Sequence, residues 1–386
     1  MQRKIIAITG ARSEFDLLYP VYKALDEDNR FDFGIIITGA HLSEKYGLSS
    51  NQIKSTGLTV EDELYNLIDS SKKIGRVISL GSQIQSLAIS LNRIKPDIVL
   101  VAGDREEALS VTTTCAYLDI PVAHFFGGDI AKDGNIDNSV RYAASKLAHI
   151  HFPSMEEHKQ TLLKLGEEES RIFVVGNPSL DKFLSTPLQG KKNISKSLNF
   201  DVENEDYLVL IQHSIISEAE NQAQIIRITL DAIIESGTKC FINYPNSDAG
   251  NHEIIEAYLE YSKKHPNQFK LFQNIERDLY INLLRNAKCL LGNSSSGLTE
   301  APSLGLAAIN IGQRQRDRVH GKNVIFVSNS IPEILIALEK IKEDSFVTNI
   351  AKKENPYGNG NSSSKIVSIL ADIELNEKLV HKNITY

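Results

Sequence analysis

Short apolar runs alternate with longer amphipathic segments along most of the chain, and this alternation constrains the fold more than any other feature. In the first half, strand-like runs such as KIIAITG, FDFGIIITG and PDIVLVAG are separated by helix-like stretches such as DLLYPVYKALDED. The second half repeats the pattern with YLVLIQHS, KCLLGNSSSG and LAAINIG. Continuous apolar strands are typical of parallel sheets that helices cover on both faces. We therefore predict an α/β protein with two doubly wound, Rossmann-like domains.

The expected domain boundary is a polar stretch from Ser185 to Glu205, which contains a proline and a glycine and is typical of a linker. We expect the N-terminal Rossmann-like domain over residues 1–184 and the C-terminal one over 205–365. A last helix within 366–386 is expected to pack back toward the N-terminal domain. The 386 residues, of which 41% are hydrophobic, are enough for two cores.

Charge and hydropathy exclude several classes of partner. The net charge is −7 and the basic residues are scattered, which argues against binding to nucleic acid or to an anionic membrane. The sequence contains no apolar run of about 18 residues and no pattern typical of a secretory signal. We therefore expect a soluble, cytoplasmic protein with no nucleic-acid or membrane partner.

Polar residues follow most of the predicted strands, where ligands bind in open α/β sheets. One such stretch, GNSSSGLTEAP, is expected to place hydroxyls and free backbone N–H groups at a helix start, where they would form a diphosphate cradle. Glu300, one turn further on, could accept hydrogen bonds from ribose hydroxyls, and Arg314 after the next strand could bind phosphate. Helix capping is the alternative role for each of these polar residues. The expected cradle consists of Ser294, Ser295, Ser296 and Gly297.

The set of motifs resembles the hydrolysing UDP-N-acetylglucosamine 2-epimerases of bacterial sialic acid and legionaminic acid biosynthesis. The motifs that carry the resemblance are TGARSEFD, TGAHLSEKYG, AGDREEAL, YPNSDAG and GNSSSGLTEAPSLGLAAINIGQRQ. They run in order from about Lys4 to about Asn323. The resemblance implies a fold similar to the GT-B glycosyltransferases, with the two domains facing across a cleft. The N-terminal domain would then hold the sugar and the catalytic residues, and the C-terminal domain the nucleotide.

The resemblance also implies a reaction. A nucleotide-activated 2-acetamido sugar would lose its C2 proton and its nucleoside diphosphate to give a 2-acetamidoglycal. Water would then add to give the free 2-epimer for nonulosonic acid biosynthesis. The substrate would be UDP-GlcNAc or UDP- or GDP-N,N'-diacetylbacillosamine. No metal and no redox cofactor would be needed, and the enzyme would be a homo-oligomer, a dimer or a tetramer.

Position by position, the resemblance implies two groups of site residues. A histidine in the core is the alternative role for His213, and helix capping is the alternative for Asp104. The expected catalytic residues are Asp104, Asp129, Asp137, Arg141 and His213. The expected nucleotide- and substrate-binding residues, besides those of the cradle, are Arg12, Asp16, Arg105, Asn246 and Asp248.

The stretch HFFGGDIAKDGNID departs from the family pattern. The family has Glu where this chain has Phe126, and a phenylalanine cannot transfer a proton. Asp129 or Asp133 could take over that role, the pair Asp104 and Asp137 could supply the base, or the substrate could differ. We favour Asp129, because the Gly-Gly pair allows a tight turn that brings it to the site, whereas Asp133 is expected in a surface turn.

Two other functions remain open on the sequence alone. A GT-B glycosyltransferase would have a similar nucleotide pocket, together with an acceptor site. A catalytically silent nucleotide-sugar binding protein is the second alternative, and Phe126 is the feature that favours it. The apolar pair Phe125 and Phe126 would also suit a less polar sugar edge.

Overall fold

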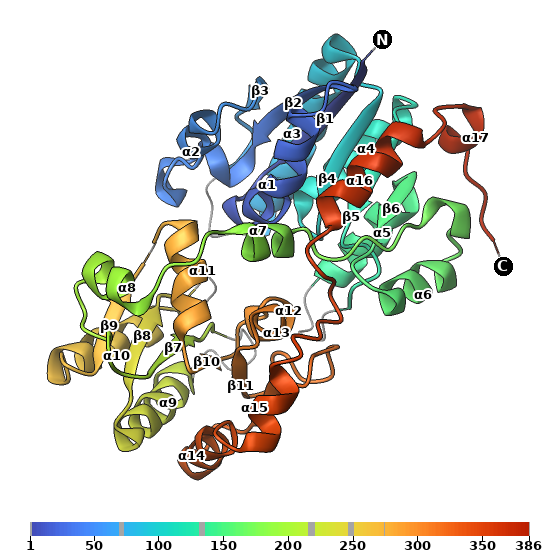
Figure 1. Ribbon diagram of the computed structural model, residues 1–386. Coiled ribbons are helices and arrows are strands. Elements are labelled where there is room, and N and C mark those ends of the chain that lie inside the picture. Colours follow the sequence, from blue (N-terminus) through green and yellow to red (C-terminus); the bar gives the residue numbers. More distant parts are fainter. Residues whose placement is uncertain are drawn as a thin grey trace. The chain divides into compact units, whose positions relative to one another are not determined.

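The computed structural model describes residues 2–68, 73–130, 136–214, 221–245, 251–273 and 275–385. The chain forms two compact units, the first made of Met1–Lys182 with Tyr357–Tyr386 and the second of Phe183–Pro356. Each unit contains a six-stranded parallel sheet between helices (Figure 1). The prediction of two doubly wound α/β domains is confirmed.

The sheet of the first unit has the strand order β3-β2-β1-β4-β5-β6. Successive strands are added to one side of β1 up to β3 and to its other side from β4 onward, and such switch points are where ligands bind in this type of sheet. The loops after β1 and β4 therefore flank the expected site. The strands are β1 (Arg3–Thr9), β2 (Phe31–Thr38), β3 (Val60–Leu64), β4 (Ile98–Ala102), β5 (Val122–Phe125) and β6 (Ile150–Phe152).

Helices cover both faces of this first sheet, and the C-terminal helix α16 packs against α1 (Figure 1). Within the described ranges no helix is long and apolar enough to cross a membrane. The α-helices are α1 (Arg12–Asp26), α2 (Ser50–Ser55), α3 (Lys73–Ile94), α4 (Glu106–Tyr117), α5 (Asp137–Leu147), α6 (Glu156–Lys164), α7 (Ser179–Ser185), α16 (Ser362–Asp372) and α17 (Glu377–Val380). Short 3-10 turns are η1 (Gly39–Leu42), η2 (Glu44–Tyr46) and η3 (Glu169–Arg171).

The sheet of the second unit has the order β12-β11-β10-β7-β8-β9. Its switch point lies between β7 and β10. The strands are β7 (Tyr207–Ile211), β8 (Lys239–Asn243), β9 (Phe269–Phe272), β10 (Cys289–Gly292), β11 (Ala307–Ile311) and β12 (Val324–Val327). The helices are α8 (Lys191–Leu198), α9 (Gln222–Ser236), α10 (Asn251–Lys264), α11 (Arg277–Asn286), α12 (Ser296–Thr299), α13 (Ala301–Leu304), α14 (Ile331–Lys340) and α15 (Asp344–Ile350).

The expected linker is part of the second unit. Helix α8 lies inside this polar stretch, and Ile194, Leu198 and Val202 are buried in a core cluster with Tyr207. Ile194 and Leu198 are four positions apart, so they share one face of α8, and Val202 packs with them from the segment that follows the helix. The second compact unit accordingly begins at Phe183 rather than at 205, and ends at Pro356 rather than at 365.

Candidate functional site

The Gly-Gly turn after β5 lies tightly against the helices that follow it. A Cβ atom at Gly128, where φ is +81°, would lie 2.1 Å from the carbonyl oxygen of His158, and one at Gly127 would lie 2.9 Å from the hydroxyl of Ser145. Phe126 also has a positive φ, 63°, which is unusual for a bulky residue. Phe126 packs against the hydrophobic core, and Phe125 is fully buried in it. The expectation that Phe125 faces the sugar was therefore wrong, because its side chain belongs to the core face of β5.

The turn brings Asp129 together with two of the other predicted catalytic residues. Arg141 on α5 is 7% exposed at its side chain and forms an ion pair with Asp104, which follows β4. Its Nη1 donates a hydrogen bond of 2.6 Å to the backbone oxygen of Asp129 and lies 3.9 Å from the Asp129 Oδ2. The arrangement places two carboxylates on either side of one buried cation, at the carboxyl edge of the first sheet.

His158 on α6 completes this group, and the sequence analysis did not predict it. Its Nε2 lies 3.4 Å from Asp129 Oδ1, and the residue is buried. The surrounding stretch, MEEHKQ, resembles an ordinary amphipathic helix, so nothing in the sequence distinguishes this histidine from a core residue. An imidazole in contact with the carboxylate can orient it or exchange a proton with it.

Asp137 occupies the first position of α5, one helical turn before Arg141. The hydrogen bond with Glu106 raises the pKa of Arg76, and the nearby charge of Asp137 contributes to this shift. Asp137 therefore lies near a cation of α3. The alternative candidate Asp133 lies outside the described residues.

Two buried glutamates at the switch point form a second acidic group. Glu14 Oε2 accepts a hydrogen bond of 3.1 Å from the backbone N–H of Gly10. A Cβ atom at Gly10 would lie 2.2 Å from Glu107 Oε1, so the glycine leaves the space that this carboxylate fills. Burial and the charge of Glu107 together raise the pKa of Glu14 to about 8. Glu14 belongs to the motif ARSEFD and Glu107 to GDREE, but the motifs predict a role only for neighbours of these two residues.

The shifted pKa of Glu14 predicts a pH-dependent stability. Between about pH 4.5 and pH 8 the folded protein retains a proton that the unfolded chain has released, so this group lowers the free energy of unfolding as pH rises. Glu14→Gln should remove that decrease and be more stable than the wild type at pH 8 and above, because its amide stays neutral. Urea unfolding at a series of pH values measures the effect. The exposed Glu27→Gln is the control, and equal pH slopes for wild type and Glu14→Gln would contradict the assignment.

The predicted cations of the first unit flank the same switch point. Arg12 begins α1 after β1 and lies 3.6 Å from Asp16 one turn later. Arg105 precedes α4 after β4, and its Nε lies 3.6 Å from Glu107 Oε2. Strands β1 and β4 are neighbours in the sheet, so both arginines lie on the loops where a ligand of this unit would bind.

In the second unit, Asn293 joins the loops that follow three strands. Its side-chain amide accepts a hydrogen bond of 2.7 Å from the backbone N–H of His213 and donates one of 2.8 Å to the His213 carbonyl. Its own carbonyl accepts a bond of 3.1 Å from Arg314 Nη1. Burial, and then the charge of Arg314, lowers the pKa of His213 to about 4. A neutral imidazole and a guanidinium therefore lie at the switch point of this sheet.

The serine loop after β10 differs in one respect from the prediction. Helix α12 is a single turn, followed at once by α13, so its dipole would contribute little to the predicted binding of a diphosphate. Ser294 Oγ accepts a hydrogen bond of 3.3 Å from the N–H of Ser296. The Ser296 hydroxyl donates one of 2.5 Å to Glu300, which also lies 3.6 Å from Arg277. Gly297 is buried beneath them.

Asn246 and Asp248 follow β8 in the chain and lie outside the described residues. The other residues predicted for the second unit follow β7, β10 and β11, which are adjacent in the sheet. The structure therefore brings the described candidates of each unit to the carboxyl edge of its own sheet.

Solved structures with the same fold are known. The chain superposes on the UDP-GlcNAc 2-epimerase from Neisseria meningitidis bound to UDP-GlcNAc with a TM-score of 0.79 and 22% identity. The superposition covers 95% of this chain and 99% of that one. The UDP-GlcNAc 2-epimerase from Methanocaldococcus jannaschii superposes with a TM-score of 0.74 at 23% identity, with coverage of 95% and 99%. These similarities establish the two-domain fold.

Sequence comparison shows the family. The chain is 32% identical to the UDP-N,N'-diacetylbacillosamine 2-epimerase (hydrolyzing) of Legionella pneumophila, over 99% of each chain. It is also 32% identical to the GDP/UDP-N,N'-diacetylbacillosamine 2-epimerase (hydrolyzing) of Campylobacter jejuni, over 99% of this chain and 98% of the relative. The profile of the family described as UDP-N-acetylglucosamine 2-epimerase matches residues 23–371. From the order of its motifs, its fold and these matches over nearly its whole length, the chain belongs to the UDP-N-acetylglucosamine 2-epimerase family.

Proposed function

We propose that the protein hydrolyses a nucleotide-activated 2-acetamido sugar and inverts its configuration at C2. The observation that carries this proposal is the pair of carboxylates, Asp104 and Asp129, held on either side of the buried Arg141. Proton transfer at C2 requires such groups, and Arg141 fixes their orientation. The family to which the chain belongs indicates which reaction these groups would carry out.

The proposed reaction has two stages. A carboxylate, Asp129 in our assignment, removes the C2 proton as the bond between C1 and the diphosphate oxygen breaks, which gives the 2-acetamidoglycal and the nucleoside diphosphate. Water then adds at C1 while a proton is delivered to C2 on the opposite face. Asp104 and Asp137 are the other carboxylates available for these proton transfers, and His158 can orient Asp129.

We assign stabilisation of the leaving diphosphate to the second unit. Its serine loop offers hydroxyls and backbone N–H groups, and Arg314 supplies a positive charge beside His213. Hydrogen bonds and cations directed at a developing negative charge are the usual means of stabilising such a leaving group. Ribose binding by Glu300 would require that residue to exchange its contacts with Ser296 and Arg277.

The serine loop gives a direct binding prediction. Replacing Ser294 and Ser295 together with Ala should weaken binding of UDP or GDP by about 1 to 3 kcal/mol, because hydrogen bonds to a charged group are lost. Isothermal calorimetry measures the change. Ser345→Ala, on the exposed surface of α15, is the control. Unchanged affinity for both nucleotides would place the diphosphate elsewhere.

For the sugar, we propose N,N'-diacetylbacillosamine over GlcNAc. The relatives from Legionella pneumophila and Campylobacter jejuni, each 32% identical over nearly the whole chain, are named for diacetylbacillosamine. The relative from Neisseria meningitidis, named UDP-N-acetylglucosamine 2-epimerase, is 30% identical over 88% of this chain and 87% of its own. Phe126 in place of the family Glu is consistent with a different substrate.

We also propose that the protein is a homo-oligomer, as the resemblance implies.

One experiment tests the proposed function. The protein is incubated with UDP-GlcNAc and with UDP- and GDP-diacetylbacillosamine in deuterated water, without an acceptor, and the products are followed by NMR. We expect free 2-epimer that carries deuterium at C2, together with the nucleoside diphosphate. A glycosyltransferase would release neither glycal nor epimer without an acceptor. Binding without turnover of any of the three would identify a silent nucleotide-sugar binding protein.

A further inference from the structure

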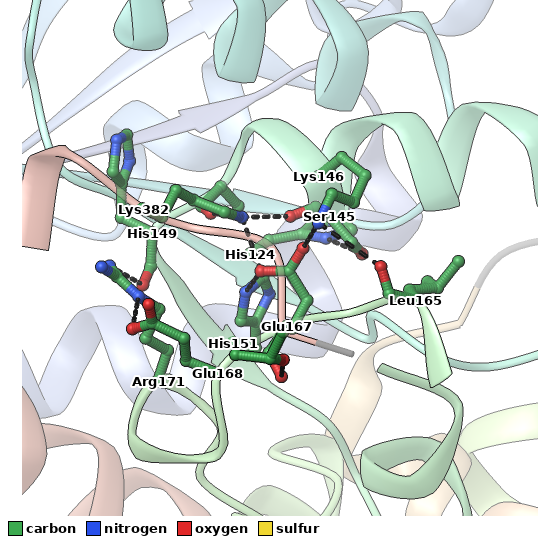
Figure 2. A network of polar contacts seen from close by, with 12 residues as sticks. His124, Ser145, Lys146, His149, His151, Leu165, Glu167, Glu168, Arg171 and Lys382 are labelled. Atoms are coloured by element: carbon green, nitrogen blue, oxygen red, sulfur yellow. Dashed lines mark hydrogen bonds and ion pairs between the residues drawn. The ribbon is translucent and has the colours of Figure 1, made fainter. Parts of the chain in front are cut away.

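The last residues of the chain are attached to the first unit along the segment that follows α6. Arg171 donates a hydrogen bond of 2.6 Å to the carbonyl of Leu379, and the N–H of Thr385 donates one of 3.2 Å to Gly166. Lys382 lies between Leu379 and Thr385 in the chain, and Figure 2 shows its side chain directed into a network of polar groups. The C-terminal segment therefore has a defined path across the unit, although its sequence, HKNIT, is polar.

The ammonium group of Lys382 closes the C-terminal end of α5. Its Nζ donates to the carbonyl oxygens of Ala148, at 2.6 Å, and Ser145, at 3.2 Å, and to Glu167 Oε2, at 2.5 Å. The last carbonyls of a helix lack their usual partners within the helix, and that of Ser145 accepts the N–H of Ala148, at 3.2 Å. A cation there also opposes the negative end of the helix dipole. The three N–H donors of an ammonium group match these three oxygens.

Glu167 holds this cation in place. Its side chain is fully buried and is bonded by His151 Nε2 at 2.9 Å and by Lys146 Nζ at 2.7 Å, as Figure 2 shows. Burial alone would raise the pKa of Glu167, but His151 and the two lysines lower it to about 2. The ionised carboxylate thus forms a fixed partner for Lys382 inside the unit.

The same end of α5 is connected to the loop of Asp104. The hydroxyl of Ser145, whose carbonyl Lys382 binds, lies 3.1 Å from His124 Nδ1. The other ring nitrogen of His124 lies 2.7 Å from the carbonyl of Gly103, the residue before Asp104. At its opposite end α5 carries Asp137 and, one turn later, Arg141.

We propose that Lys382 is a positioning residue for the epimerase reaction, because it holds α5 and thereby the placement of Arg141 against Asp104 and Asp129. This inference rests on the proposed function. Helix α5 has 11 residues, about 16 Å of rise, so a displacement at one end is transmitted to the other. Misplacement of reacting groups by about 1 Å can lower turnover by about 100-fold.

The protonation state of Lys382 supplies a specific signature. The charged and titratable groups that interact with it are Glu167, Glu168, Lys146, Arg171, His124, His149 and His151. Burial lowers the pKa of Lys382 to about 8, although Glu167 opposes this shift. Burial also lowers the pKa values of all three histidines, so they stay neutral above pH 7. A neutral amine has only two N–H donors for the three oxygens and no positive charge to pair with Glu167. Its hold on α5 should weaken, so turnover should decrease as pH rises through about 8.

The kinetic test compares three variants. Lys382→Met should lower kcat at pH 7 by about tenfold or more with a smaller change in KM, because the proposed diphosphate site lies in the second unit. Lys382→Arg, which stays charged, should lose the alkaline decrease that the wild type shows. Lys378→Met, on the exposed side of α17, is the matched control and should behave as wild type. A wild-type kcat and pH profile for Lys382→Met would overturn the proposal.

A structural readout keeps this test separate from the proposed function. Hydrogen exchange at one pH should be faster in peptides of α5 in Lys382→Met than in wild type, with no change in the second unit or in Lys378→Met. If the wild type turns over no nucleotide sugar, the proposed function fails, and faster exchange in α5 still supports the role of Lys382 in holding the helix. Unchanged exchange in α5 would overturn that role whatever the activity.

Discussion

Replacing Asp129 with Asn is expected to lower turnover of the nucleotide sugar by about 100-fold or more, the usual contribution of a general acid or base. Asp129 lies between Arg141 and His158, where a carboxylate can be oriented and can exchange a proton. The amide keeps the shape of the side chain but cannot accept the C2 proton. Nucleotide affinity should stay nearly unchanged, since the proposed diphosphate site lies in the second unit. Steady-state kinetics and calorimetry measure the two quantities.

Two controls accompany this variant. Asp119→Asn changes the same group on the surface, at a position whose φ of 55° suits Asn as well as Asp, and should be as active as the wild type. Asp133→Asn should also have little effect. The residual product of Asp129→Asn in deuterated water should still carry deuterium at C2, because a slower proton transfer leaves the route unchanged. Normal turnover in Asp129→Asn, with loss in Asp104→Asn or Asp137→Asn, would transfer the role to those carboxylates.

Replacing Arg141 with Met should abolish measurable turnover and lower the free energy of unfolding by about 3 kcal/mol. The side chain is 7% exposed and is the cation shared by Asp104 and Asp129. Its removal leaves two carboxylates without the cation that both contact, and breaking a buried ion pair from one side is costly. Urea unfolding measures the stability change, and NMR detection of product measures the activity.

The matched control for Arg141 is Arg93→Met. Arg93 forms an ion pair with Asp62 at 2.8 Å, but its side chain is 58% exposed, so its loss should cost less than about 1 kcal/mol. The double variant Asp104→Asn with Arg141→Met should be less destabilised than the sum of the single variants, because the two residues interact directly. Additive losses would show that Arg141 and Asp104 stabilise the fold independently.

The local pattern of residues was enough to predict the fold class and the loops that carry the candidate site. Apolar runs of strand length recur between amphipathic segments, and the residues after these runs include Asp104, Asp129 and His213. In a parallel sheet the residues that directly follow the strands lie at the same, carboxyl edge. Their position in the sequence therefore predicts that they lie close together at that edge. The pattern did not predict α8, because three apolar residues in a polar stretch resemble a linker when considered one at a time.

Other parts of the site depended on contacts that no local pattern encodes. Glu14 and Glu107 belong to motifs that pointed to their neighbours, and their burial follows from the space left by Gly10. His158 meets Asp129 only because the Gly-Gly turn lies against α6.

By itself, the sequence determined two doubly wound domains, the loops at their switch points and the family that these motifs resemble, because periodicity and strand ends are properties of neighbouring residues. Only the tertiary structure decided which polar groups meet. Lys382 and Ala148 are 234 positions apart and yet form a hydrogen bond. Such a contact depends on how α5, β6 and the C-terminal segment pack together, and packing is decided by the whole core rather than by the residues adjacent in the chain.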